Sequence, residues 1–160
     1  MNYKFLPHTA DVKFQAFGGT VEEAFSNAVL ALRETISGKV NVFEKKEKKI
    51  SVEGKDFESL LYNFLEEFLV LLDAEGFLVS KVKEIKIDAK NVNILGHHKN
   101  KKSFSDRKNF ELKAVVLGDD ALKYKFSNAV KAITYNDMFV KQDQGLANPI
   151  RWAVQVVVDV

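Results

Sequence analysis

Two carboxylates stand side by side at the C-terminal end of the sequence. Asp159 follows the strand-like run 152–158, and the α-carboxylate of Val160 comes directly after it. Oxygen groups of this kind are the ligands that hard divalent cations prefer. Asp11 precedes a second strand-like segment, 12–17, and supplies a third carboxylate if the two segments pair. The hypothesis is a metal site at Asp11, Asp159 and Val160; the alternative is a set of solvated surface carboxylates.

The alternation of side chains along the two segments indicates which faces these carboxylates occupy. Asp11 shares the more polar face of its segment with Gln15, and Asp159 shares a face with Gln155. The opposite faces are apolar and belong to the expected core: Val12, Phe14 and Ala16 in the first segment, and Trp152, Val154, Val156 and Val158 in the second. Three adjacent carboxylates repel one another, and a bound cation removes this repulsion. Ligation by oxygen alone favours Ca²⁺, Mg²⁺ or Mn²⁺ over zinc.

A few other polar side chains are candidates for a functional role. His8 can do acid–base work or support a site, or it is a histidine packed at a strand start. Lys131 and Tyr135 are spaced to point the same way from a strand and can contact a partner, although a lysine lying along the surface and a half-buried tyrosine are simpler readings. His97-His98 lies among lysines and is expected to be solvated. The known sequence motifs of hydrolases, nucleotide-binding proteins and zinc peptidases are missing.

Composition narrows the class of protein. The chain has 160 residues, 46% of them hydrophobic, which fits one soluble domain over 1–160. It has no Cys, which excludes disulfides, thiolate chemistry and cysteine-based metal sites. No signal peptide is recognisable and no apolar run approaches the about 20 residues that cross a bilayer, so we expect a cytoplasmic protein. The net charge of +2 does not itself indicate nucleic-acid binding. The basic segments 44–49 and 97–108 are solvated surface or contacts to an RNA-bearing partner.

The elements that must position these groups are two helices followed by strands. Thr20 and Glu23 form a capping box that begins a helix, and Gly38 ends it. Asp56 caps a second helix with a wide Leu/Phe stripe, which ends at Gly76. Strands are expected over 12–17, 39–53, 77–88, 92–95, 110–117, 129–135, 138–141 and 151–160, with a turn at 136–137 and loops over 96–109 and 142–149. This order predicts an α+β fold, a two-layer sandwich with two amphipathic helices on a mostly antiparallel mixed sheet.

Several motifs, in order along almost the whole chain, resemble the archease family. They are Phe5-Leu-Pro-His-Thr-Ala-Asp-Val12, Gly19-Thr-Val-Glu-Glu-Ala-Phe25, Ser59-Leu-Leu-Tyr62, Asp73-Ala-Glu-Gly-Phe77, Lys131-Ala-Ile-Thr-Tyr-Asn-Asp-Met138 and Val156-Val-Val-Asp-Val160. The chain departs from the family pattern at Asn136, where histidine is usual. The resemblance covers the expected fold and all three carboxylates.

The resemblance implies a function that the residues alone do not. Archeases are small cytoplasmic proteins that activate RtcB-type RNA-splicing ligases in tRNA splicing, helping guanylylation and turnover without catalysing ligation. Carried over, the family's metal ligands are Asp11, Asp159 and the Val160 carboxylate. Ca²⁺ is the expected ion, with Mg²⁺ or Mn²⁺ as alternatives. RNA contact through the ligase, a monomeric state and no membrane association are further expectations. The alternative function is a chaperone-like modulator of a tRNA-modifying methyltransferase; an independent metal hydrolase lacks an identifiable nucleophile.

Overall fold

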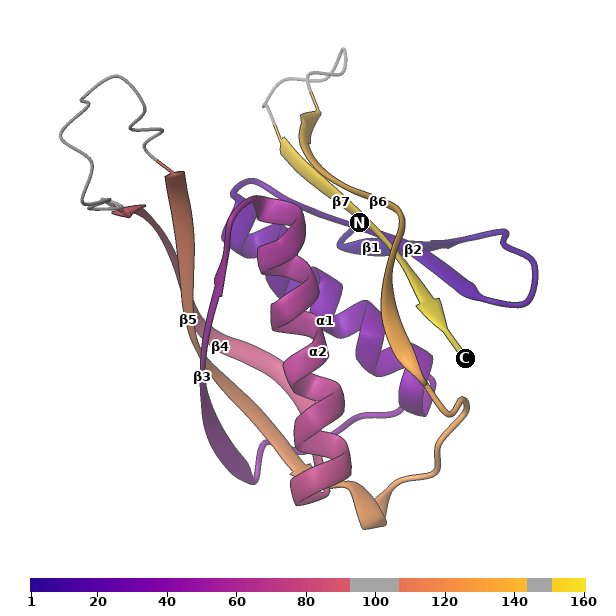
Figure 1. Cartoon of the computed structure of the whole chain (residues 1–160). Helices are drawn as coiled ribbons and strands as arrows, with labels where there is room; N and C mark the ends of the chain where they lie inside the picture. Colours follow the sequence, from indigo (N-terminus) through magenta and orange to yellow (C-terminus); the bar gives the residue numbers. More distant parts are fainter. Residues whose placement is uncertain (93–106, 144–150) are drawn as a thin grey trace, which may run out of the picture.

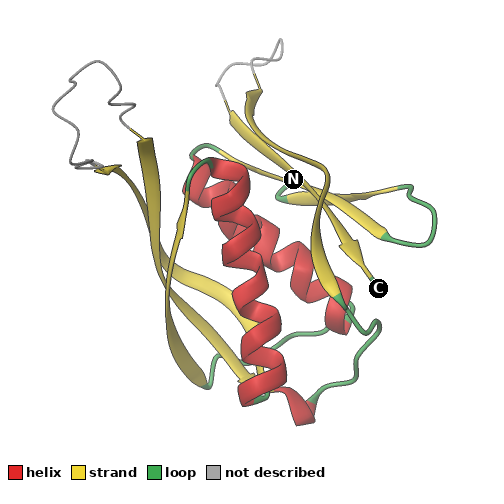
Figure 2. Cartoon of the chain, in the orientation of Figure 1, coloured by secondary structure: helices red, strands yellow, loops and turns green. Residues whose placement is uncertain are grey.

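The strands form two antiparallel sheets, and two helices lie between them (Figures 1 and 2). The computed structural model describes residues 1–92, 107–143 and 151–160. The first sheet has the order β1-β2-β7-β6 and consists of β1 (Tyr3–Leu6), β2 (Val12–Gly18), β6 (Ala132–Asp143) and β7 (Arg151–Asp159). The second has the order β3-β5-β4 and consists of β3 (Lys46–Gly54), β4 (Phe77–Val92) and β5 (Arg107–Asp120). The helices are α1 (Val21–Ser37) and α2 (Phe57–Glu75), and a short 3₁₀ helix, η1, spans Ala121–Lys123.

The predicted α+β class, with two amphipathic helices on antiparallel strands, is confirmed. The expectation of one mixed sheet is wrong, because every described pairing is antiparallel and the strands divide into two sheets. The cause lies in the helices, which are apolar on more than one side. In α1, neighbouring residues that point to different sides of the helix are buried, so one sheet cannot shield all of them from water. These buried pairs are Ala24 and Phe25, Ala28 and Val29, and Ala31 and Leu32. Each helix therefore contacts strands of both sheets.

Both helix boundaries follow the sequence signals. The Thr20 hydroxyl accepts a hydrogen bond from the Glu23 amide at 3.1 Å, as a capping box requires. The Glu23 carboxylate accepts from the Gly19 amide at 3.1 Å rather than from Thr20. Gly38 ends α1 at φ 71°, a left-handed conformation that glycine adopts without a Cβ clash. The first helix was thus predicted to within a residue at both ends.

The second helix carries a reciprocal cap at its N-terminus. The Asp56 carboxylate accepts from the Ser59 amide at 2.7 Å, and the Ser59 hydroxyl interacts with the Asp56 backbone in return. The predicted stripe faces the core: six of its residues are buried, and Phe57 and Leu72 are half-buried against them; the buried six are Leu60, Leu61, Phe64, Leu65, Phe68 and Leu69. Phe64 stacks on Phe25 of α1 with the ring centroids 6.4 Å apart, which joins the two helices in the core. No helix in the described residues is long and apolar enough to cross a membrane.

Replacing Asp56 by alanine is expected to lower the free energy of unfolding by about 1 kcal/mol, because the Ser59 amide loses its acceptor. The Ser59 amide bond lowers the pKa of Asp56 below its ordinary value. The carboxylate therefore stabilises the fold above about pH 4, the unfolded pKa, and this contribution is lost as the pH falls through the lower folded pKa. Urea unfolding at neutral pH and at about pH 3 measures both effects. Asp56→Asn keeps an acceptor and serves as the control; equal losses in both variants at neutral pH contradict the cap.

Several predicted strand limits need correction. Strand β1 was not predicted, and the segment 39–53 forms a strand only over Lys46–Gly54. Strand β4 runs unbroken to Val92, so the expected break between 88 and 92 is wrong; residues 93–95 lie outside the described residues. Strand β5 begins at Arg107, inside the expected basic loop. Strand β6 runs to Asp143, so the first two residues of the expected loop 142–149 are strand instead. The rest of that loop, and the remainder of the basic loop with His97-His98, fall outside the described residues.

Candidate functional site

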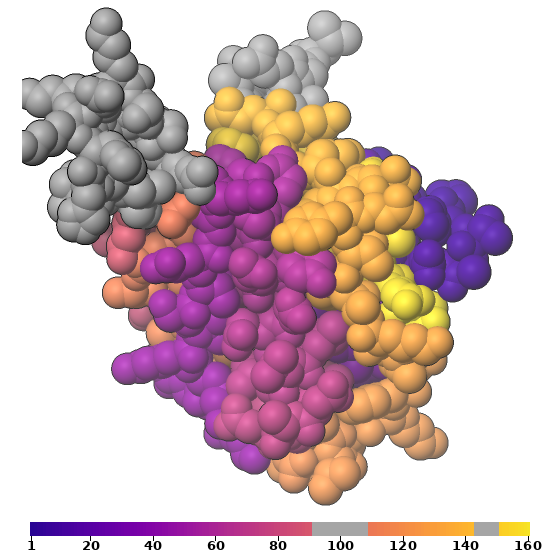
Figure 3. All heavy atoms as spheres, in the orientation of Figure 1, coloured from indigo at the N-terminus to yellow at the C-terminus, as the bar shows by residue number. Residues whose placement is uncertain are grey.

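The pairing of β2 with β7 joins the two ends of the chain. The strands run antiparallel with Val12 opposite Val158, Phe14 opposite Val156 and Gln15 opposite Gln155. Continued by one residue, this register would put Asp11 opposite Asp159, with Val160 directly after it. In Figure 3 the yellow C-terminal residues lie between the indigo N-terminal residues and the orange residues of β6. The strand pairing on which the metal hypothesis depends is therefore present in the fold.

The faces of both strands are those that the alternation predicted. Phe14, Val154, Val156 and Val158 are buried in the core that faces the helices. On the other face the Gln15 side-chain amide donates to the Gln155 side chain at 2.9 Å. Asp159 belongs to the same face as Gln155, because residues four apart in a strand share a face. Asp11 immediately precedes β2, four residues before Gln15.

The carboxylates of Asp11 and Asp159 have no partner among the described residues that would neutralise their negative charge. Both residues are half-buried, as is Val160. Within the described ranges, neither carboxylate takes part in an ion pair or a hydrogen bond. The main-chain carbonyl of Asp159 accepts from the Lys131 amide at 2.8 Å, which fixes the backbone at the end of β7. Ala10 has φ 68°, an unfavourable value for a residue with a Cβ, so the chain enters Asp11 in a constrained conformation.

Strand β6 contains a large bulge beside the site. Thr134 pairs with Val157 and Phe139 with Gln155, so residues 135–138 of β6 lie opposite the single residue 156. The predicted turn at 136–137 is therefore wrong, and the two predicted strands around it are one strand. The cause is a local kink: Asp137 has φ 53°, and its carbonyl accepts from the Gln155 side chain at 2.7 Å. The bulge covers the polar face of β7.

An ion pair and an amide pair hold this bulge against β2 and β7. The Lys13 ammonium lies 3.5 Å from the Asp137 carboxylate, and Gln155 bonds both Gln15 and the Asp137 carbonyl. Sequence reasoning placed Gln15 and Gln155 on the polar face but missed Asp137, which it assigned to a turn. The signal available was the run of polar residues after Tyr135, which fits a bulge as well as a turn.

None of the other predicted contact residues bonds to the carboxylate of Asp11 or Asp159 in the described part of the chain. Lys131 is exposed and immediately precedes β6, where Ala132 pairs with Asp159. His8 is half-buried in the loop before β2, and its Nδ1 is buried without a hydrogen-bond partner among the residues described. Tyr135 is 54% exposed in the bulge. The expectation that Lys131 and Tyr135 share one strand face does not hold, because Lys131 lies before the strand and Tyr135 inside the bulge.

Tyr135 stacks on a residue that the sequence did not single out as its partner. Its ring lies parallel to that of Tyr62 on α2, with centroids 4.3 Å apart and an interplanar angle of 6°. Burial raises the pKa of Tyr135, and Tyr62, Asp56 and Glu66 add to the effect, so the phenol stays neutral at physiological pH. The pair ties the bulge to the helix layer. The sequence did not reveal this contact because α2 and β6 are far apart along the chain.

The donor set fits a hard divalent cation. No three His, Cys, Asp or Glu side chains gather in the described part of the chain. The predicted set contains only two such side chains, Asp11 and Asp159, and its third oxygen group is the main-chain carboxylate of Val160. Three half-buried anionic groups with no protein cation bonded to them in the described residues are what Ca²⁺, Mg²⁺ or Mn²⁺ ligation needs. Asp11, Asp159 and Val160 are therefore the residues that would hold the metal.

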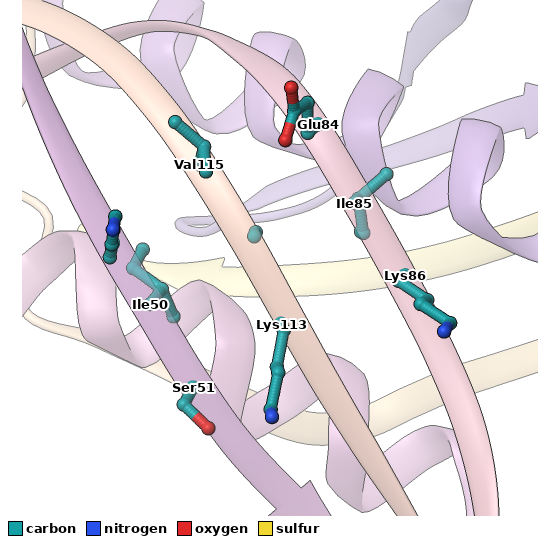
Figure 4. A pocket seen from close by; sticks show the side chains of 9 residues that line it. Ile50, Ser51, Glu84, Ile85, Lys86, Lys113 and Val115 are labelled. Atoms are coloured by element: carbon teal, nitrogen blue, oxygen red, sulfur yellow. The ribbon is translucent and has the colours of Figure 1, made fainter.

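A hollow on the surface of the described residues lies elsewhere in the molecule. It measures about 630 Å³ and lies on the β3-β5-β4 sheet, across the helix layer from the carboxylates (Figures 1 and 4). Lys113 and Lys86 line it, and each is paired with a neighbouring carboxylate, Glu111 at 3.3 Å and Asp88 at 3.6 Å. The hollow is open, and two of the three lysines that line it are partly neutralised. We therefore assign the functional site to the β2–β7 strand ends.

The fold is that of a small α+β protein in which β2 and β7, from the two ends of the chain, pair with each other. The Archease protein family matches residues 3–160. Archease from Pyrococcus abyssi is 41% identical over 162 residues, covering 99% of this chain and 98% of that protein. Archease from Pyrobaculum neutrophilum is 34% identical, covering 99% and 95%. The chain belongs to the archease family.

One solved structure supports the fold independently. The solution structure of Methanobacterium thermoautotrophicum protein 1598 has a TM-score of 0.69 and covers 99% of both chains at 24% sequence identity. At this level of identity, the match bears on the fold alone. The predicted family resemblance and the predicted fold class are both confirmed.

Proposed function

We propose that this protein is a non-catalytic activator of an RtcB-type RNA-splicing ligase and promotes guanylylation of the ligase. The main support is the pairing of β2 with β7, whose register, continued one residue past Val12 and Val158, would put Asp11 opposite Asp159. Membership of the archease family supports the same function. We place the protein in the cytoplasm, with RNA contacted through the ligase rather than by this chain directly.

Each residue of the site has a separate part in this proposal. The carboxylates of Asp11, Asp159 and Val160 bind the cation, and the constrained backbone at Ala10 and the Lys131 amide hold the strand ends in place. A bound divalent cation supplies positive charge that can neutralise the phosphate oxygens of a nucleotide. The tip formed by the strand ends approaches the nucleotide site of the ligase, and the exposed Lys131 contacts the ligase or its anionic ligand. Guanylyl transfer itself is left to the ligase.

The test is guanylylation of a purified RtcB-type ligase from the same organism, with radiolabelled GTP. We expect this protein at catalytic amounts to raise the yield of guanylylated ligase at least about tenfold, with Ca²⁺, Mg²⁺ and Mn²⁺ compared in parallel; a tenfold change corresponds to about 1.4 kcal/mol. Removing divalent cations from the activator with a chelator, followed by gel filtration, is expected to abolish the effect until metal is restored. A ligase that gains nothing from the protein under every metal condition contradicts the proposal.

A further inference from the structure

Two neighbouring segments at one end of the molecule expose apolar side chains in an ordered setting. They are residues 38–45, which follow α1, and residues 121–128, which begin with η1 (Figure 1). Eight large hydrophobic side chains are exposed in the described part of the chain, and four of them lie here: Val40 at 39%, Phe43 at 57%, Leu122 at 93% and Phe126 at 48%. We call the exposed side chains of these two segments the loop-end surface. A solvated loop rarely gathers so many apolar groups without a binding partner.

Hydrogen bonds hold the two segments together, so the exposure is not a consequence of loose packing. The Phe43 amide donates to the Tyr124 hydroxyl at 2.9 Å, and that hydroxyl donates to the buried carboxylate of Asp119 at 2.8 Å. The Ser127 amide donates to the Ile36 carbonyl at 2.7 Å at the end of α1. The Ser80 hydroxyl donates to the carbonyl of Val42 at 2.6 Å. A surface fixed in this way needs little ordering when it binds.

The charge of the loop-end surface indicates the chemistry of its partner. The segments contain four lysines, Lys39, Lys45, Lys123 and Lys125, and one acidic residue, Glu44. Glu44 is paired with Lys81 of β4 at 3.0 Å, and Lys123 is paired with the buried Asp119 at 3.2 Å, so Lys39, Lys45 and Lys125 carry the excess positive charge of these segments. The same segments expose the aliphatic Leu122 and Val40, which cannot stack on nucleic-acid bases. Apolar anchors inside a positive rim fit a protein surface with an apolar groove and an acidic edge.

The loop-end surface continues directly into the carboxylate site. The chain passes from Phe126 through Ser127 and Asn128, both bonded to the end of α1, to Lys131, whose amide donates to the Asp159 carbonyl. In Figure 1 this orange segment rises from η1 to the start of β6 beside the C-terminus. A partner held on the loop-end surface is thereby held in a fixed relation to Asp11 and Asp159.

We infer that the loop-end surface is the docking site for the ligase, which presents to it an apolar groove with an acidic edge. The inference rests on the proposed function. It assigns affinity for the ligase to the loop-end surface and stimulation of the ligase to the carboxylates. The two roles can be resolved, because affinity and maximal stimulation are independent measurements. Loss of an anchor raises the dissociation constant, whereas loss of a carboxylate lowers the stimulation reached at saturation.

The experiment compares Leu122→Asp combined with Phe126→Asp against Val70→Asp, an apolar-to-acid change at a 49% exposed position of α2. Dissociation constants for the purified ligase are measured by biolayer interferometry, and guanylylation is measured at limiting and saturating activator. The double variant is expected to bind at least about tenfold more weakly, as loss of interface anchors does, and to recover wild-type stimulation at saturation. Val70→Asp is expected to bind like the wild type. Lys125→Glu is expected to weaken ligase binding, and the loss of affinity should be larger at low salt than at high salt.

The possible results separate the inference from the proposed function. Wild-type affinity in the double variant, with a wild-type protein that activates the ligase, overturns the docking site and leaves the proposed function intact. A wild-type protein that neither binds nor activates the ligase overturns both. A fluorescence anisotropy arm with tRNA halves provides a further check. If the double variant loses RNA binding but keeps ligase binding, the surface belongs to RNA and the inference is overturned.

Discussion

Asp159→Asn is expected to abolish stimulation of ligase guanylylation while the protein stays folded. The substitution keeps the size of the side chain and removes one of three negative charges, and the affinity of an oxygen site for a divalent cation depends on how many charged ligands it has. Asp11→Asn should act in the same way. A glycine added after Val160 moves the terminal carboxylate by about 3.3 Å and leaves a neutral carbonyl behind, so it should act like the two substitutions.

Two measurements that do not involve the ligase accompany this test. Calorimetric titration with Ca²⁺ or Mn²⁺ should show affinity reduced at least about tenfold in each of the three variants. The thermal midpoint of the wild-type protein should rise when metal is added, since a ligand at 100 times its Kd contributes about 2.7 kcal/mol to stability, and the variants should show a smaller rise. Asp88→Asn is the matched control, because Asp88 lies on the other sheet and is paired with Lys86.

Each outcome distinguishes between roles. Full stimulation and full metal affinity in all three variants contradict the carboxylate site. If the variants lose metal but a partner methyltransferase still depends on the protein for solubility, the chaperone-like function is favoured over ligase activation. If the Asp11→Asn and Asp159→Asn variants are inactive but the glycine extension changes nothing, the two aspartates remain as metal ligands and the terminal carboxylate is excluded as the third.

Phe14→Ala is expected to lower the free energy of unfolding by about 3 to 5 kcal/mol, a large share of the stability of a typical domain. Phe14 is fully buried on β2, opposite Val156 of β7, and its ring meets the ring of Phe5 edge-on at 6.3 Å. Truncation leaves a cavity beneath the two strands that hold the carboxylates. Urea unfolding followed by circular dichroism measures the loss.

The matched control for this prediction is Phe5→Ala. Phe5 touches the same ring from β1, but 41% of it is exposed, so its removal leaves no enclosed cavity. A loss of about 1 kcal/mol or less is expected. Equal losses in the two variants contradict the assignment of Phe14 to the core. Because Phe14 is not a metal ligand, the folded fraction of Phe14→Ala should bind metal like the wild type. In a titration at low temperature, binding should therefore fall only in proportion to the fraction of protein that is unfolded.

Local signals in the sequence predicted much of this structure. Both helices were located from their caps, because an N-cap side chain and a terminal glycine act within one turn of the chain. The phase of β2 and β7 followed from strict alternation, so the faces of Phe14 and Gln155 were correct. These features depend on near neighbours, which a single sequence displays.

The features that were missed depend on partners distant in the chain. The division into two sheets follows from how both sides of α1 are covered, and alternation within a strand does not reveal this. The bulge in β6 depends on Gln155 bonding the Asp137 carbonyl, and the stacked ring on Tyr135 comes from Tyr62 of α2. The opposition of Asp11 and Asp159 could be stated only conditionally, because which strand β2 pairs with is not encoded in its own residues.

The pairing of β2 with β7 also has a consequence for the kinetics of folding. The side-chain bond between Gln15 and Gln155 joins residues 140 positions apart. Bringing such distant segments together costs chain entropy before any contact is gained, and folds dominated by non-local pairing form slowly. The helix caps, which span three residues, have no such cost. We therefore expect the β2–β7 pairing to form late in folding, after the helices that its strands cover.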